Sequence, residues 1–443
     1  MDRRQFIKGS AALAAATVVN QKAKGATLPD SGFNDNQTDS GSKLITSAPM
    51  LQNFAATSIG VAFSVSDMAN GYVNVSEKAD MSFAKTFKCG GYRVTDMNDK
   101  VMLVRVTGLK PATRYYYTIG ADRISYKGGY DMKITGNEND PRVYSFVTAG
   151  RQAESHFCVI NDTHAHYDTF GVLTDKIAEL SPACVIWNGD ATNNEEKIEN
   201  QEEIFLNPPI SRRDYASEIP YIFCPGNHDS RGMANRHIER VMMFRQPEER
   251  SSRDWDLGRN FAVRLGDIAM IGLDTAEDKV DTNPIFAGLF NSGAYREAQV
   301  DWLYDALNRR EIASAPYLVA FCHIPLHDDD PTHNPGDVFP ADKDPQYKSD
   351  FAYWQRTCAN LWTPLLQKAG CQLIITAHMH EYRFDAPDAG RNWAQIVGGG
   401  PDLKSDRSFP TVLEGKVEEG CLKILVHNMK TGKVMAEHVF PPR

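Results

Sequence analysis

Residues 221–229 read YIFCPGNHD, a run of four apolar residues that passes through a Pro-Gly turn into Asn227, His228 and Asp229. A short apolar run bounded by Pro and Gly is typical of a buried strand. Asparagine, histidine and aspartate side chains bind metal ions and take part in acid–base chemistry. The stretch therefore predicts a buried strand whose carboxyl end carries functional side chains.

The same arrangement is repeated at four other places in the chain. Apolar runs at 157–160, 183–187, 317–322 and 372–376 each lead directly into polar residues. Ligands of an α/β sheet gather at the carboxyl ends of its strands, so we expect the five runs to bring their polar side chains to one edge of a sheet. The polar residues concerned are Asp162, His164, Asp190, Asn227, His228, Asp229, His323, His378 and His380.

This mixture of side chains suits a pair of metal ions. Two ions about 3.5–4 Å apart need a shared ligand, which an ionised carboxylate can provide. Histidine together with aspartate favours Mn, Fe or Zn over Ca or Mg. An asparagine oxygen adds a neutral ligand and limits the negative charge around the pair. The expected cofactor is therefore two divalent or trivalent metal ions.

Two kinds of pattern divide the chain. Residues 46–149 contain short apolar or alternating runs separated by turns, which predicts an all-β domain. Within it, LKPATRYYY at 109–117 resembles the tyrosine corner of a fibronectin type III strand, in which the hydroxyl of Tyr115 would bond to nearby backbone; an unrelated hairpin is the alternative. Residues 150–443 alternate strand and helix patterns, which predicts an α/β domain.

The N-terminus has the features of an export signal. Arg3 and Arg4 precede an apolar run of small residues at 11–19 that is too short to span a bilayer. We expect a twin-arginine signal peptide at 1–25, a flexible linker at 26–45, and a periplasmic or secreted mature protein. An uncleaved N-terminal helix is the alternative. Since no later run reaches about 18 apolar residues, we expect no transmembrane anchor.

Composition sets further bounds. The 443 residues are 42% hydrophobic and 24% charged, as in ordinary globular proteins. The net charge of -9 argues against nucleic acid as a partner, but it allows a small phosphate ester drawn to local metal ions. Four cysteines in strand-like runs are expected to be reduced and buried, while the pattern leaves the other four open. The four cysteines expected to be reduced and buried are Cys158, Cys184, Cys224 and Cys322.

The order of the polar motifs resembles that of the calcineurin-like metallophosphoesterases. The motifs are Asp-x-His, Gly-Asp, Gly-Asn-His-Asp, a lone His after a strand, and His-x-His, and they span residues 154–396. The resemblance implies a β-sheet sandwich flanked by helices, with the metal site at the carboxyl ends of strands. It further implies that Asp162, His164 and His380 hold one metal, that Asn227, His323 and His378 hold the other, and that Asp190 bridges them.

The resemblance also implies roles for two residues that bind no metal. His228 would face the substrate, where it protonates the leaving oxygen or steadies the phosphoryl charge. Asp229 would orient His228. One departure from the family pattern is Ala377, which stands where the family usually has Gly.

The order of the two domains resembles that of purple acid phosphatases, but the metal site differs from theirs. Those proteins have a Tyr three residues after the bridging Asp, where this chain has Asn193, and they lack the histidine present here as His164. We therefore expect a colourless protein with a tyrosine-free metal site.

The predicted function is hydrolysis of a phosphate ester by a hydroxide that the metal pair generates. A phosphomonoesterase is the first expectation and a phosphodiesterase for small diesters is the second. The third is a surface protein that binds glycans or partners and keeps a vestigial metal site; the complete ligand set argues against it. A long Pro- and Asp-rich insertion at 326–350 is expected to shape the substrate pocket.

Overall fold

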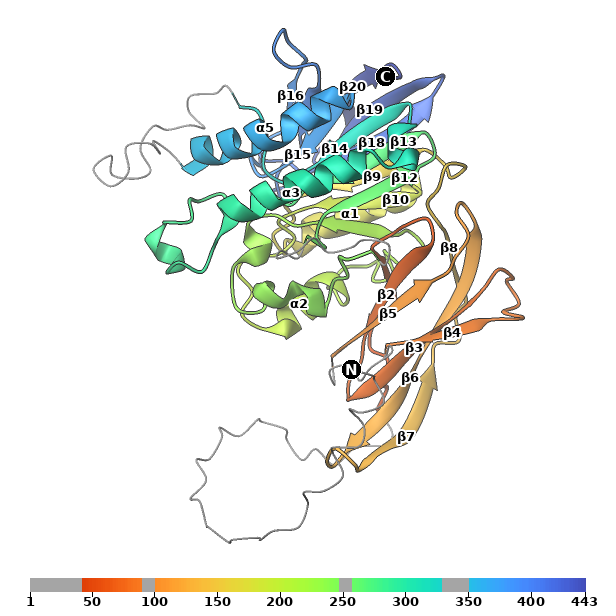
Figure 1. The fold of residues 1–443 in the computed structure, drawn as a ribbon. Coiled ribbons are helices and arrows are strands. Elements are labelled where there is room, and N and C mark those ends of the chain that lie inside the picture. Colours follow the sequence, from red (N-terminus) through yellow and green to blue (C-terminus); the bar gives the residue numbers. More distant parts are fainter. Residues whose placement is uncertain (1–41, 90–99, 247–256, 329–349) are drawn as a thin grey trace, which may run out of the picture. The chain divides into compact units, whose positions relative to one another are not determined.

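The computed structural model describes residues 42–89, 100–246, 257–328 and 350–443 (Figure 1). The predicted signal peptide and most of the insertion at 326–350 lie outside the described residues. Among the helices of the described part, none has the length and apolar character needed to cross a membrane.

The largest sheet has nine strands and mixes both strand directions. Its centre is parallel, and antiparallel strands extend it on both sides. In spatial order the strands are β20 (Lys433–Phe440), β19 (Cys421–Asn428), β18 (Thr411–Glu418), β9 (His156–Ile160), β10 (Cys184–Asn188), β11 (Tyr221–Cys224), β1 (Met50–Gln52), β2 (Ser58–Ser64) and β5 (Val101–Thr107).

A second sheet of six strands packs against the first. Its four central strands are parallel and its two edge strands run antiparallel to their neighbours. The order is β12 (Phe261–Leu265), β13 (Ile268–Gly272), β14 (Tyr317–Phe321), β15 (Leu373–Thr376), β17 (Ala394–Val397) and β16 (Arg383–Asp385).

Helices cover the outer faces of these two sheets. Along β9, Phe157 and Val159 face the core between the sheets, while Cys158 and Ile160 face the helices on the outer side. Such strands are buried on both faces, which is why they read as continuous apolar runs. The helices are α1 (Tyr167–Leu180) and α2 (Ile198–Phe205) on the first sheet, and α3 (Ser292–Leu307), α4 (Arg310–Ala313) and α5 (Asp350–Lys368) on the second.

The predicted sandwich flanked by helices is confirmed, but the expectation of one sheet edge is wrong. The five apolar runs are divided between two sheets: β9, β10 and β11 lie in the first, and β14 and β15 in the second. Asn188, at the end of β10, joins them by donating to the carbonyls of Cys322 (3.1 Å) and Ile375 (3.3 Å). The strand ends therefore converge across the sandwich rather than along one sheet.

The strands before residue 150 belong to two sheets. Three of them extend the nine-stranded sheet, and the others form a five-stranded antiparallel sheet. The Tyr115 hydroxyl accepts a hydrogen bond from the Lys110 N–H at 2.9 Å, as expected for a tyrosine corner. The fibronectin type III-like fold of 46–149 stays a prediction. The five-stranded sheet contains β4 (Lys85–Lys88), β3 (Ala69–Ser76), β6 (Arg114–Tyr126), β7 (Met132–Asn139) and β8 (Tyr144–Val147).

All eight cysteines are free, and the four predicted to be buried are buried. Of the four left open by the sequence, Cys358 and Cys371 are buried, whereas Cys89 and Cys421 are partly exposed.

Candidate metal centre

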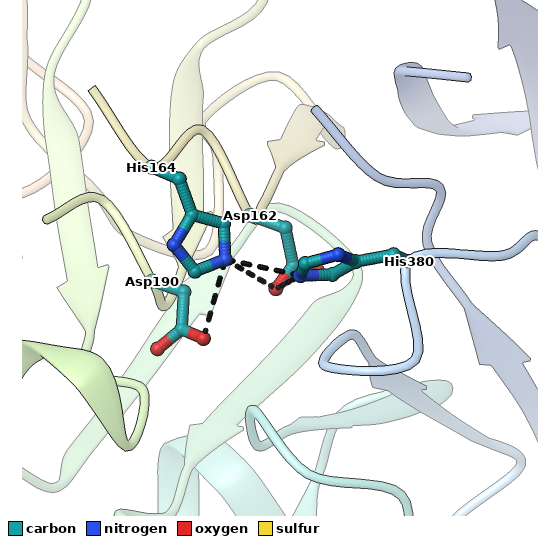
Figure 2. Close-up of side chains that lie close together, drawn as sticks. All are labelled: Asp162, His164, Asp190 and His380. Carbon is teal, nitrogen blue, oxygen red and sulfur yellow. Dashed lines mark hydrogen bonds and ion pairs between the residues drawn. The ribbon is translucent and has the colours of Figure 1, made fainter. Parts of the chain in front are cut away.

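The predicted ligands converge where the strands end. Asp162, His164, Asp190 and His380 offer ligand atoms that all lie within 4.8 Å of one another (Figure 2). A second group with the same spacing consists of Asp190, His323 and His378. Asp190 alone belongs to both groups, as a bridging ligand must.

Short distances define the centre. His164 Nε2 lies 3.6 Å from an oxygen of Asp190 and 3.0 Å from His380 Nε2. His380 Nε2 lies 3.4 Å from Asp162 Oδ1. His323 Nε2 approaches Asp190 to 3.2 Å. The remaining predicted ligand, Asn227, has its side-chain oxygen 3.1 Å from His378 Nδ1.

The backbone adopts an uncommon conformation at five of these residues. Left-handed φ values cost non-glycine residues roughly 1–2 kcal/mol each and persist only where the surrounding structure enforces them. Their concentration after the ends of three strands, β9, β10 and β15, turns each side chain toward a common point. The values are Asp162 +46°, His164 +44°, Asp190 +48°, His378 +69° and His380 +55°.

Two glycines allow the loops to approach closely. A Cβ on Gly226 would lie 2.2 Å from Asp190 Oδ1. A Cβ on Gly189, whose φ is +83°, would lie 2.3 Å from His323 Nδ1. Both glycines are therefore required by contact with predicted ligands. Ala377, at the position where the family usually has Gly, is buried and donates its N–H to the His323 carbonyl at 2.7 Å.

Hydrogen bonds orient two of the imidazoles. His323 Nδ1 lies 2.9 Å from the Asn188 carbonyl, and His164 Nδ1 lies 3.0 Å from Asn193 Oδ1. A proton on each Nδ1 leaves each Nε2 free as a ligand, as is usual for metal-binding histidines. Sequence reasoning identified Asn193 only as the replacement for a tyrosine and missed this orienting contact.

Buried polar atoms without partners mark where a cation fits. Asp162 Oδ1 and His323 Nε2 are both buried and have no hydrogen-bond partner among the described residues. Leaving such an atom unsatisfied costs about 1–3 kcal/mol. Both atoms face the cluster of carboxylate and imidazole groups, so divalent metal ions bound in the two ligand groups would satisfy both atoms.

By sequence, residues 155–382, more than half of the 443, match the calcineurin-like phosphoesterase family. The chain belongs to this family. It is therefore a hydrolase that acts on phosphate esters, and its ligand cluster is that of a metal-dependent enzyme. Residues 1–19 match the twin-arginine translocation signal, so the phosphoesterase is exported across a membrane.

Solved structures share the fold at low sequence identity. A purple acid phosphatase from yellow lupin (Lupinus luteus) seeds is 13% identical with a TM-score of 0.58, over 88% of this chain and 73% of that one. PhoD is 11% identical with a TM-score of 0.59, over 90% of each chain. No curated protein matches the phosphoesterase by sequence.

Asp229 has a different role from the one expected. Its carboxylate accepts hydrogen bonds from the backbone N–H groups of Asp190 (2.7 Å), Thr192 (3.0 Å) and Gly226 (2.8 Å), and from the Thr192 hydroxyl (2.9 Å). Among the described residues it makes no hydrogen bond with His228. Asp229 therefore fixes the loop that carries Asp190, and it does not hold the His228 ring by a hydrogen bond as expected.

Arg231 contacts His228 instead. Its guanidinium lies 3.0 Å from His228 Nε2 and is held by Glu277 (2.9 Å) and Asp278 (2.8 Å). An oxygen of Asp278 also lies 3.9 Å from His378 Nε2. Sequence reasoning missed these residues because no motif marks the segment that carries the two carboxylates.

Burial and neighbouring charges shift the pKa values of His228 and His323 in opposite directions. Burial lowers the pKa of His228 to about 4, with the Arg231 charge adding to the effect against the opposing Asp190. Burial also disfavours the charged form of His323, but the Asp190 carboxylate outweighs it and raises the pKa of His323 to about 10. A bound cation would take the place of the positive charge that the Asp190 carboxylate favours on His323.

Proposed function

We propose that the phosphoesterase hydrolyses phosphate monoesters at a centre of two metal ions, each of them Mn, Fe or Zn. The observation that carries this proposal is the position of Asp190, whose carboxylate belongs to both groups of candidate ligands. One ion would be held by Asp162, His164 and His380, the other by Asn227, His323 and His378, with Asp190 between them.

When bound, such a metal pair neutralises phosphate charge and lowers the pKa of a water molecule to near neutral. The protein supplies the positions of the ligands. Neither ligand group contains a Cys, and every carboxylate in them is assigned to metal. Water therefore attacks phosphorus directly, and no phospho-enzyme forms.

His228 acts in this proposal as a neutral hydrogen-bonding group that steadies phosphoryl charge. A guanidinium always donates, so the contact with Arg231 requires His228 Nε2 to accept and places the ring proton on Nδ1. Nδ1 has no hydrogen-bond partner among the described residues. The adjacent positive charge also disfavours the imidazolium form that a general acid would need.

The choice of a monoester is supported by the fold shared with a protein named a phosphatase. Convergence of all seven predicted ligands argues against a vestigial site. The mature enzyme would work in the periplasm or outside the cell, where its substrate is a small phosphate ester.

The test uses the mature enzyme reconstituted with Mn, Fe or Zn and assayed on 4-nitrophenyl phosphate and bis(4-nitrophenyl) phosphate. The proposal predicts a higher kcat/KM for the monoester. A higher value for the diester would make the enzyme a phosphodiesterase. Full metal loading with turnover of neither ester would contradict the proposal.

A further inference from the structure

A cavity of about 780 Å³ adjoins the loop that carries Asn227 and His228. Its volume is in the range typical of small-molecule sites. Gly226 and Ser230 line it, while none of the seven candidate metal ligands does. Gly226 also contacts Asp190, so the cavity and the metal centre share a wall.

The cavity is positively charged within an acidic protein. Among the described residues, four arginines line it, against two acidic residues, Glu239 and Asp274. Asp274 is already engaged, since its carboxylate accepts hydrogen bonds from the Ala276 N–H (2.8 Å) and the Tyr295 hydroxyl (3.1 Å). A local excess of positive charge concentrates anions. The arginines are Arg105, Arg236, Arg245 and Arg259.

Two of these arginines keep their donors available. The Arg259 side chain is 27% exposed, and the carboxylate oxygen closest to it in the described ranges, on Asp274, is 3.8 Å away, beyond hydrogen-bond distance. Within the described part of the chain, neither the Arg259 nor the Arg236 guanidinium makes a hydrogen bond. Each instead lies near an aromatic ring, 5.5 Å from the centre of Phe244 for Arg259 and 6.0 Å from that of Phe290 for Arg236.

The remaining walls combine apolar side chains with the polar residues Ser230, Asn291, Ser292 and Tyr295. Met242, Phe244, Leu289 and Phe290 face the same space as the two guanidiniums. A planar guanidinium beside an aromatic ring is suited to paired hydrogen bonds with a carboxylate, sulfonate or phosphate. The chemistry of the walls therefore matches an anion that also has an apolar or aromatic body.

We propose that this cavity binds an organic anion with an apolar or aromatic body, anchored by Arg259 and Arg236. The anion has two potential sources. One is the end of the substrate remote from the scissile phosphate, and this case rests on the proposed function. The other is a separate molecule that binds beside the catalytic loop.

The test is calorimetric titration of the full mature chain with 1-naphthalenesulfonate. Loss of a charged hydrogen bond should weaken binding on the order of ten- to a hundredfold in both Arg259→Met and Arg236→Met. Arg142→Met is the control, because Arg142 also stacks on an aromatic ring (5.0 Å from Tyr144) but does not line this cavity. Equal affinity in all four proteins, or no binding to the wild type at millimolar concentration, would overturn the proposal. Thermal unfolding checks each variant, and the exposed Arg236 keeps the test valid should Arg259→Met fail to fold.

Kinetics then separate the two sources. If the cavity holds the far end of the substrate, the wild type should prefer a carboxybiphenyl phosphate to phenyl phosphate. In that case Arg259→Met should abolish the preference, and 1-naphthalenesulfonate should compete with the carboxylated ester. If the anion is a separate molecule, the sulfonate should compete with neither ester. Because calorimetry requires no turnover, absence of hydrolysis would contradict the proposed function without affecting the cavity.

Discussion

Replacing His228 by alanine separates metal binding from catalysis. The ring is half-buried and belongs to neither group of ligand atoms. Arg231 would lose one contact but keep both carboxylates, Glu277 and Asp278. We therefore expect His228→Ala to fold and to retain the metal content of the wild type.

Turnover should nevertheless fall. Removing one hydrogen-bond donor that stabilises a charged transition state costs about 10²–10³ in kcat. Because the proposed function gives His228 the role of stabilising phosphoryl charge, the factor should be the same for good and poor leaving groups. The assay is kcat for phenyl phosphate and 4-nitrophenyl phosphate, with metal content measured on the same samples.

Asp190→Ala is the matched comparison. It removes the shared carboxylate, so metal content and activity should fall together for both esters. Loss of metal from His228→Ala would show that the ligand assignment is wrong. A much smaller loss with 4-nitrophenyl phosphate than with phenyl phosphate would refute the charge-stabilising role and make His228 the general acid.

Five further outcomes are expected. Elemental analysis of protein purified without chelator should find two equivalents of Mn, Fe or Zn, and one equivalent that reconstitution cannot raise would contradict the shared site. The iron-loaded oxidised enzyme should lack an intense visible absorption band, because Asn193 provides no tyrosinate. The Asn193→Ala variant should bind metal about 10–100-fold more weakly in a chelator competition, because the His164 ring loses its orienting partner. Asp229→Asn should lower the free energy of unfolding by roughly 2–5 kcal/mol in urea titrations, because an amide cannot accept all four hydrogen bonds from the loop and leaves buried N–H groups unsatisfied; an unchanged midpoint would contradict this. Glu414 is bonded by His156 (3.0 Å) and His427 (2.8 Å), which lower the pKa of Glu414 to about 2. Its ionised form therefore contributes at most about 3 kcal/mol of stability above pH 4.5, and this contribution is lost as the pH falls toward 2. In acid unfolding, Glu414→Gln should therefore lose less stability than the wild type between pH 4.5 and 2.

The strands that build the site, and the candidate ligands that follow them, could be predicted from the sequence alone. Runs such as 221–224 are apolar throughout because their strands are buried on both faces, and this local property is visible without a structure. Each run leads into a polar motif, and side chains at the carboxyl ends of such strands gather together. The positions of the motifs in the sequence therefore predicted which side chains would lie close to one another. Four of the six buried cysteines were predicted from the same runs.

Only the tertiary structure decided how these parts meet. Local patterns do not specify pairing between distant strands, so the division of the five runs between two sheets could not be read from them. Asp229 lies next to His228 in the chain, yet its hydrogen bonds go to a loop almost forty residues away. The contact between Arg231 and Glu277 likewise joins segments 46 positions apart. Such partners are chosen by packing, because a buried carboxylate or guanidinium must find whichever opposing groups the folded chain brings within reach.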